Sequence, residues 1–262
     1  MDRPQRWNAL LDLLAHEGRL SVETAAKQLE VSVATIRRDL DQLAQQQMLT
    51  RTRGGAVSHA VSYDLPLRYK TARNVPEKQR IGLAAAALVP AGATVGLNGG
   101  TTTTEVARAL ATRADLYDST SRAASVTIVT NALNLANELV LRPHVKVVVT
   151  GGVVRPQSYE LIGPLAMLLP EQISLDIAIL GVDGIDPDQG ATAHNEGEAS
   201  INQLMATQAR QVVVVADASK LGIVAFARMW PAERIATLVT NTGADPAIVS
   251  RLSERGIRVV MA

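Results

Sequence analysis

Apolar residues recur at three- and four-residue spacing along the first part of the chain. Such spacing predicts three amphipathic helices in succession, with the stripes Trp7, Leu10, Leu11 and Leu14; Val22, Ala25, Ala26 and Leu29; and Val33, Ile36, Leu40 and Leu43. Gly18 is placed to end the first helix, and Ser21 and Ser32 are placed to cap the second and the third. Only Glu30 and Val31 separate the second stripe from Ser32, which predicts an abrupt helix-turn-helix.

The pattern changes twice after these helices. Residues 48–57 predict a short hairpin that turns at or near Gly54-Gly55. Residues 58–76 include Pro66 and Pro76 and show little periodicity, so we expect a linker. The predicted organisation is a first domain over residues 1–57, a linker over 58–76 and a second domain over 77–262.

From Glu77 onward, β-branched runs alternate with amphipathic stretches. Continuous apolar runs of this kind predict an α/β fold with a mostly parallel sheet that is buried on both faces. The expected strands are residues 94–97, 126–129, 145–149, 177–180, 212–216, 235–239 and 257–261. The expected helices include residues 103–111, 133–141, 198–209 and 246–254.

Composition narrows the class of protein. The 262 residues are 47% hydrophobic and 19% charged, and no window approaches the unbroken apolar length of a membrane span. The chain has no cysteine, and its start lacks the apolar stretch of a secretory signal, so we expect a cytoplasmic protein. The four histidines are scattered, and we expect no metal and no cofactor. The net charge of +1 shows no global bias toward nucleic acid, so DNA binding must be argued locally.

The third predicted helix has an apolar face and a polar face, as a helix that reads DNA requires. Its apolar stripe faces inward, while Thr35 and Arg38 share the outer face and Arg37 flanks it. Arginine can make a bidentate contact to guanine or clamp phosphate. Arg51 and Arg53 lie on the hairpin, where a wing would touch the DNA backbone. Physical reasoning alone leaves open a protein-interaction module with solvated arginines.

A second candidate site begins where the strand over residues 94–97 ends. The segment Asn98–Thr102, which we call the anion loop, reads Asn-Gly-Gly-Thr-Thr and leads into a helix. Glycines let backbone N–H groups turn toward an anion, and the helix N-terminus adds partial positive charge. Thr102 and Glu105 have the spacing of a capping box. A capped turn without any ligand is the alternative, and the loop has neither a Walker A nor a dinucleotide-binding pattern.

Polar residues also follow other predicted strands, at the edge where open α/β sheets bind ligands. In a phosphorylated polyol site the anion loop would hold the phosphate, Lys220 would add a cation, and Asn131, Asp183 and Glu198 would bond hydroxyls. Each residue alone also has an ordinary structural explanation, as a helix cap, a turn or a solvated charge.

The run Ser32-Val33-Ala34-Thr35-Ile36-Arg37-Arg38-Asp39-Leu40, followed by Arg51-Thr52-Arg53-Gly54-Gly55-Ala56, resembles the winged helix-turn-helix of DeoR-family bacterial repressors. The family usually has His where this chain has Arg53. The resemblance implies DNA contacts from Ser32, Thr35, Arg37 and Arg38, and it suggests that Asp39 orients an arginine. With the wing, the candidate DNA-binding residues are Ser32, Thr35, Arg37, Arg38, Arg51 and Arg53.

The remaining motifs resemble the sensor domain of the same family, which is similar in fold to ribose-5-phosphate isomerase A and coenzyme A transferases. The resemblance implies an effector site formed by Asn98, Gly99, Gly100, Thr101, Thr102, Asn131, Gly152, Arg155, Asp183, Glu198 and Lys220. Two departures concern hydroxyl recognition: most members have Asp-Ser-Gly-Thr-Thr in the anion loop, and most have Lys where this chain has Asn202.

The sequence therefore predicts a DNA-binding transcriptional regulator rather than an enzyme. We expect a repressor of a carbohydrate or nucleoside catabolic operon. Its expected partners are double-stranded operator DNA, a phosphorylated sugar-type effector and further copies of itself, as a homodimer or homotetramer, without a membrane. The alternative is a sugar-phosphate isomerase-like or transferase-like enzyme with a fused DNA-binding domain, in which Glu198, Asp183 and Lys220 would be the acid–base groups.

Overall fold

The computed structural model describes residues 1–45, 48–57, 67, 74–116 and 125–262. The chain divides into two compact units, Met1–Arg73 and Asn74–Ala262. Most of the predicted linker, residues 58–66 and 68–73, lies outside the described residues. No helix in the described ranges is both long enough and apolar enough to cross a bilayer.

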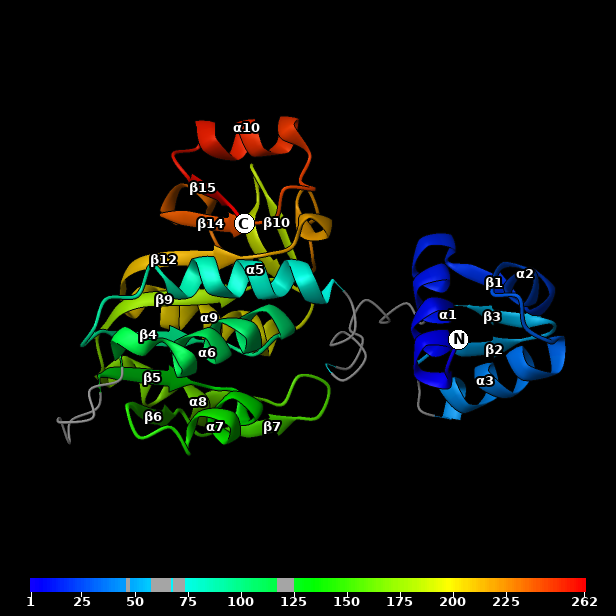
Figure 1. The fold of residues 1–262 in the computed structure, drawn as a ribbon, viewed down its shortest axis with the longest axis horizontal. Helices are drawn as coiled ribbons and strands as arrows, with labels where there is room; N and C mark the ends of the chain where they lie inside the picture. The colour runs from blue at the N-terminus through cyan, green and yellow to red at the C-terminus, as the bar shows by residue number, and fades with distance from the viewer. Residues whose placement is uncertain (46–47, 58–66, 68–73, 117–124) are drawn as a thin grey trace. The chain divides into compact units, whose positions relative to one another are not determined.

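Three helices lie within residues 1–45 of the first unit, as predicted (Figure 1). They are α1 (Arg3–Glu17), α2 (Val22–Gln28) and α3 (Val33–Gln45). Gly18 ends α1 with a φ of 68°, a left-handed conformation that glycine adopts without strain. Ser21 caps α2 by accepting a backbone hydrogen bond from its first turn.

A small antiparallel sheet completes the first unit. Its strands are β1 (Arg19–Ser21), β2 (Thr50–Thr52) and β3 (Gly55–Val57), in the order β1-β3-β2. The β2–β3 hairpin confirms the prediction, whereas β1 is too short to show alternation in the sequence. A Cβ on Gly55 would lie 2.1 Å from the carbonyl oxygen of Leu20, so the close approach of β1 and β3 requires glycine there.

The apolar stripes of the three helices meet in one core, with one exception. Ile36, Leu40 and Leu43 of α3 are fully buried, but Val33 is 37% exposed. The prediction that Val33 faces inward is therefore wrong. Side chains on a helix lean toward its N-terminus, and Val33 is the first residue of α3, so its side chain projects past the end of the core.

The second unit is built on a seven-stranded sheet in the order β15-β14-β12-β9-β4-β5-β6. All of its neighbouring strands are parallel. The strands are β4 (Thr94–Leu97), β5 (Val126–Thr130), β6 (Val145–Val149), β9 (Leu175–Gly181), β12 (Ala209–Val215), β14 (Thr237–Thr240) and β15 (Arg258–Met261). They match the predicted strands with ends that differ by a few residues, which confirms the mostly parallel α/β class.

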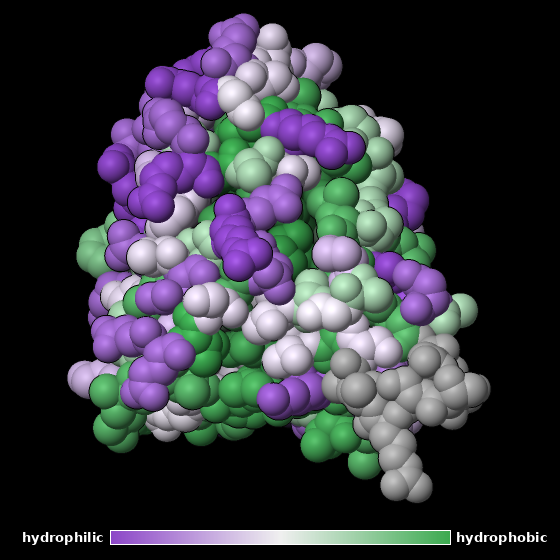
Figure 2. Space-filling view, turned by 90° about the vertical axis from the view of Figure 1, so that its left-hand side faces the viewer, coloured by the Kyte–Doolittle hydropathy of each residue, from purple (hydrophilic) through white to green (hydrophobic). Residues whose placement is uncertain are grey.

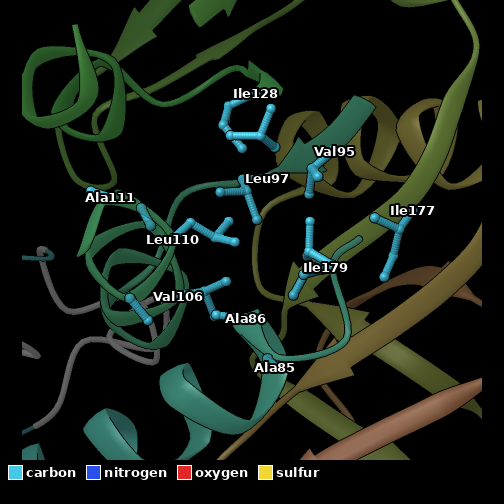
Figure 3. Close-up of a cluster of buried hydrophobic side chains, with 14 of the residues drawn as sticks. Ala85, Ala86, Val95, Leu97, Val106, Leu110, Ala111, Ile128, Ile177 and Ile179 are labelled. Carbon is cyan, nitrogen blue, oxygen red and sulfur yellow. The ribbon is translucent and has the colours of Figure 1, made fainter. Parts of the chain in front are cut away.

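Helices cover both faces of this sheet. Residues of α5 (Val75–Ala86), α6 (Thr101–Thr112) and α7 (Leu133–Leu139) share one apolar cluster with one face. Residues of α9 (Glu196–Gln208) and α10 (Pro246–Glu254) belong to the cluster of the other face. Figure 3 shows part of the first cluster, in which sheet and helix side chains meet: Val95, Leu97, Ile128, Ile177 and Ile179 with Ala85, Ala86, Val106, Leu110 and Ala111. The helix α5 begins two residues before the predicted start of the second domain at Glu77.

Short antiparallel strands, which the sequence pattern does not predict, form two small sheets apart from the large one. One hairpin pairs β7 (Val153–Arg155) with β8 (Glu160–Ile162). A separate sheet has the order β10-β11-β13, with β10 at Gly184–Asp186, β11 at Gly190–Ala193 and β13 at Ala227–Trp230. Single turns of helix occur as α8 (Pro164–Met167), η1 (Ala114–Leu116), η2 (Pro170–Gln172), η3 (Ala218–Lys220) and η4 (Ala232–Arg234).

The strand order of the large sheet reverses direction between β4 and β9. From β4 the chain moves outward through β5 to β6, whereas from β9 it moves outward in the opposite direction through β12 to β14. Ligands of open α/β sheets bind at such a switch point, beyond the carboxyl ends of the strands. Figure 2 views the opposite end of the sheet, where hydrophilic and hydrophobic residues are interspersed. There the exposed side chains of Asp176 and Arg210 form an ion pair at 3.4 Å.

Candidate functional site

The first turn of α3 is fixed by its own side chains. Ser32 accepts a hydrogen bond from the backbone N–H of Thr35 at 3.1 Å, and the hydroxyl oxygens of the two residues lie 2.8 Å apart. This is the predicted N-cap. Since Ser32 remains exposed, the positive end of α3 is both ordered and open to solvent, which is the arrangement that favours a phosphate.

Arg37 and Arg38 are exposed on α3. Neither forms an ion pair with another residue in the described part of the chain. Their neighbours Ile36 and Leu40 are fully buried, so the helix presents an apolar face to its own core and a basic face to solvent. That division is what a recognition helix requires.

Asp39 lies on the buried side of α3 and is only 3% exposed. Its carboxylate accepts hydrogen bonds from Arg6 Nε at 2.5 Å and from Trp7 Nε1 at 2.9 Å. The carboxylate also raises the pKa of the Arg6 guanidinium through that hydrogen bond. Asp39 therefore binds an arginine, as the resemblance suggests, but the arginine belongs to α1, and the contact fastens α3 to α1.

The two arginines of the hairpin differ in their surroundings. Arg51 donates from Nε to Asp41 at 2.6 Å and from Nη1 to the carbonyl oxygen of Gly55. Arg53 is exposed beside Gly54, whose φ of 80° forms the turn. Arg51 thus holds the hairpin against α3, and Arg53 is the arginine at its tip.

In the second unit, Asn98 joins the two strands of the switch point. It is 3% exposed, and its amide makes two hydrogen bonds to Gly181 at the end of β9. Asn98 Nδ2 donates to the Gly181 carbonyl at 2.9 Å, and the Gly181 N–H donates to Asn98 Oδ1 at 2.8 Å. The sequence predicts that Asn98 binds the effector. In the structure both polar atoms of its amide are hydrogen-bonded to the backbone of Gly181.

The helix α6 begins at Thr101 without a side-chain cap. The predicted Thr102–Glu105 capping box is wrong. The helix begins two residues earlier than that box requires, with Gly100 as N-cap at a φ of 141°, and Glu105 pairs instead with Arg108 at 2.7 Å. Glycine tolerates that backbone conformation. The first-turn N–H groups of α6 thus have no side-chain acceptor at the N-cap, which favours binding of an external anion.

Glu160 of β8 contacts the anion loop and is not among the predicted site residues. It is 2% exposed and accepts a hydrogen bond from the Gly99 N–H. Burial, together with the nearby Glu198 carboxyl, raises the pKa of Glu160 well above its ordinary value. No local pattern marks this residue, because β8 has only three residues and its position depends on long-range pairing.

The remaining candidate residues partly converge on the same edge. Arg155 Nη1 lies 3.1 Å from Glu198 Oε1, and Lys220 Nζ lies 4.0 Å from Asp183 Oδ1. The Asp183 carboxylate also accepts a hydrogen bond from the His194 N–H at 3.0 Å. The structure therefore places two cations and two carboxyls of the predicted set around the switch point.

Asn131 and Gly152 have structural roles of their own. Asn131 is fully buried; its Nδ2 donates to the Leu161 carbonyl at 3.4 Å, and its Oδ1 has no hydrogen-bond partner among the described residues. Gly152 has a φ of 120°, and a Cβ there would lie 2.8 Å from the Cβ of Ala166. Packing against α8 is therefore sufficient to require this glycine.

Comparison with known proteins covers nearly the whole chain. The DeoR-like helix-turn-helix domain matches residues 6–60, and the DeoR C terminal sensor domain matches residues 73–242. The Glycerol-3-phosphate regulon repressor of Escherichia coli is 30% identical over 259 residues, which cover 99% of each chain. The HTH-type transcriptional repressor GlcR of Bacillus subtilis is 31% identical over 264 residues, covering 100% of this chain and 97% of the relative.

Solved structures show more distant likenesses. Ribose 5-phosphate isomerase A from Methanocaldococcus jannaschii has 19% identity and a TM-score of 0.39, covering 55% of this chain and 52% of the other. The full-length Sorbitol Operon Regulator SorC from Klebsiella pneumoniae has 14% identity and a TM-score of 0.39, covering 96% and 99%. At these scores neither structure carries an argument about the site.

Proposed function

The chain belongs to the DeoR family of transcriptional regulators, and from this premise we propose that it represses a carbohydrate operon until a phosphorylated sugar binds its second unit. Relatives that match over almost the full length are named as transcriptional repressors, which confirms the prediction of a regulator rather than an enzyme. Operator DNA and a sugar-type effector are accordingly its partners.

The basic face of α3 is the observation that carries the proposed DNA contact. Arg37 and Arg38 are exposed and have no ion-pair partner in the described ranges, while Asp39 on the inner side holds the helix to Arg6. A helix held in this way can enter the major groove without first breaking an internal contact of its arginines. Ser32, Thr35 and Arg53 complete the proposed interface.

The test is an Arg38→Ala variant measured on a duplex selected by the purified protein from fragments of its own genome. We expect the affinity for that duplex to fall by about 1–3 kcal/mol, and salt to weaken binding by the wild type. The matched control is Arg210→Ala, because Arg210 is 82% exposed at the far end of the large sheet. Equal affinities of the two variants would refute the assignment of α3 as the reading helix.

The proposed effector site is the anion loop with the charged groups around it. The uncapped N-terminus of α6 supplies donors for a phosphate, and Arg155 and Lys220 supply nearby cations. Asp183 and Glu198 are acceptors for sugar hydroxyls. One relative is named for the glycerol-3-phosphate regulon, so glycerol 3-phosphate belongs in the first ligand panel with pentose and hexose phosphates.

Thermal unfolding with this panel tests the effector class. A ligand at a hundred times its dissociation constant stabilises the native state by about 2.7 kcal/mol, so a true effector raises the melting temperature and releases the selected duplex. The matching unphosphorylated sugars are the control. Stabilisation by those sugars to the same extent would refute a phosphate-based effector.

We further propose that the protein acts in the cytoplasm as a dimer or a higher oligomer. Each chain has one α3, and operators with two-fold symmetry are read by paired helices. Sedimentation of the full chain tests this proposal, and a monomer that still binds its duplex with full affinity would contradict it.

A further inference from the structure

Glu160 accepts the hydrogen bond of a backbone N–H in the anion loop that would otherwise be available to a ligand. Its carboxylate accepts the hydrogen bond of the Gly99 N–H, and its side chain fills the space above that glycine. A Cβ on Gly99 would lie 2.5 Å from Glu160 Cγ and 2.8 Å from Oε1. Gly99 and Glu160 are therefore mutually dependent: a side chain at position 99 excludes the observed position of Glu160.

The charges that face Glu160 come from several elements. Glu198 of α9 is close enough to share a hydrogen bond with the Glu160 carboxyl, and Asp183 adds a second negative charge. Arg155 of β7 pairs with Glu198, and Lys220 of η3 lies beside Asp183. In these ion pairs the two cations lie beside Glu198 and Asp183 rather than beside the buried Glu160.

Further titratable groups lie at the margin of this cluster. The His194 N–H donates to Asp183. Asp217 accepts hydrogen bonds from Ser219 and Asn74. Glu196, in the first turn of α9, is exposed. Neither Asp217 nor Glu196 has a hydrogen bond to the Glu160 carboxyl in the described part of the chain.

We propose that Glu160 is an internal occupant of the anion loop, whose carboxylate holds the Gly99 donor until an anionic effector displaces or neutralises it. This inference rests on the proposed effector site and adds a residue that selects among its ligands. A neutral polyol can enter without disturbing Glu160. When Glu160 is ionised, an anion that binds at Gly99 must overcome a negative charge at hydrogen-bonding distance.

The occupant makes anion binding depend on pH. Burial and Glu198 already favour the neutral form of Glu160, because they raise its pKa. A bound anion favours that form further, so binding takes up a proton. Anion affinity must then rise as pH falls through the range in which Glu160 becomes protonated. With the amide of Glu160→Gln at this position, both the repulsion and this proton uptake disappear.

Sulfate binding to the full chain tests the inference, because sulfate keeps its charge where a phosphate monoester titrates near pH 6. Calorimetry compares wild type, Glu160→Gln and the control Glu196→Gln, which removes an equal charge from the exposed start of α9. The titrations are repeated across a pH series. Above the pH at which Glu160 loses its proton, we expect Glu160→Gln to bind sulfate on the order of tenfold tighter than wild type and Glu196→Gln. Below that pH we expect the wild type to approach the variant.

Affinities of wild type and Glu160→Gln within about twofold of each other across the whole pH series would overturn the proposal. Glu160→Ser, which also removes the charge, replaces Glu160→Gln if the latter does not melt cooperatively, with the same expected result. The operator-release assay with sugar phosphates judges the proposed function separately. Release by a sugar phosphate without any sulfate difference defeats the inference alone, and a sulfate difference without release defeats the effector class alone.

Discussion

Removing the Asp39 carboxylate should destabilise the first unit rather than increase its affinity for DNA. Asp39 is 3% exposed, and its carboxylate accepts three hydrogen bonds, two from Arg6 and one from Trp7. If Asp39 faced the phosphate backbone, Asp39→Ala would remove a repulsion and tighten binding. Because it is buried, the substitution instead leaves the Arg6 guanidinium and the Trp7 N–H without their acceptor.

The structure sets the size of this effect. Breaking a buried ion pair by removing one partner costs about 3–5 kcal/mol. The Arg6 side chain keeps 13% exposure, so water partly rehydrates it, and we expect about 2–3 kcal/mol for the pair. The unpaired indole N–H adds roughly 1 kcal/mol. For a domain of this size each kcal/mol lowers the melting temperature by about 4–8 °C.

The two tryptophans of the chain allow each unit to be followed separately. Trp7 lies in the first unit and Trp230 in the second. In a Trp230→Phe background, urea unfolding followed by the fluorescence of Trp7 reports the first unit alone. The matched control is Asp41→Ala, because Asp41 is an exposed acid on the same helix, and exposed pairs contribute at most about 1 kcal/mol. An Asp39→Ala variant as stable as Asp41→Ala would refute the reasoning.

Three further predictions concern single side chains. Asn98→Ala removes both hydrogen bonds to Gly181, so the free energy of unfolding of the second unit should fall by about 1–3 kcal/mol in urea. Glu160 has a raised pKa in the folded state, so the folded state holds the proton more tightly and stability must decrease as pH rises from the ordinary carboxyl range through that raised pKa. In Glu160→Gln, melting curves across pH should lose this decrease. Arg53→Ala should weaken binding to all duplexes and reduce the salt dependence, whereas Arg51→Ala should mainly lower the melting temperature of the first unit, because Arg51 is engaged internally.

The sequence was sufficient to predict a helix, strand or cap wherever residues within that element determine its structure. The inner strands of the large sheet are buried on both faces, so they are visible as continuous apolar stretches. The inner strand β4 has the predicted bounds, and so does the partly exposed edge strand β6. The caps at Ser21 and Ser32 depend on residues three positions away and could be predicted as well. Short strands such as β1 and β8 carry no periodicity and are defined only by their distant partners.

The candidate sites follow the same rule. The basic face of α3 could be predicted because it depends on one helix. The partners of Arg51 and Asp39 could not, because the choice between an internal and an external contact depends on packing between elements. Glu160 was missed for that reason: it lies 61 residues from Gly99 in the sequence. The predicted capping box is wrong because α6 begins two residues early, at a backbone conformation that glycine permits.

The unusual start of the anion loop can be understood as one linked set of residues. At position 98 the side chain must both donate to the carbonyl of Gly181 and accept from its N–H. An amide does both, whereas the aspartate of the resemblance could only accept. The missing carboxylate is supplied instead from β8 by Glu160, and Gly99 leaves the room that Glu160 requires. Gly99 and Glu160 therefore depend on each other, next to an Asn98 that joins β4 to β9. Asn98→Asp alone would break one strand-joining hydrogen bond and add a fourth carboxyl to the cluster, so its sulfate affinity should fall below that of the wild type. A gain in sulfate affinity for Asn98→Asp would contradict the expectation that another carboxyl at the anion loop repels the anion.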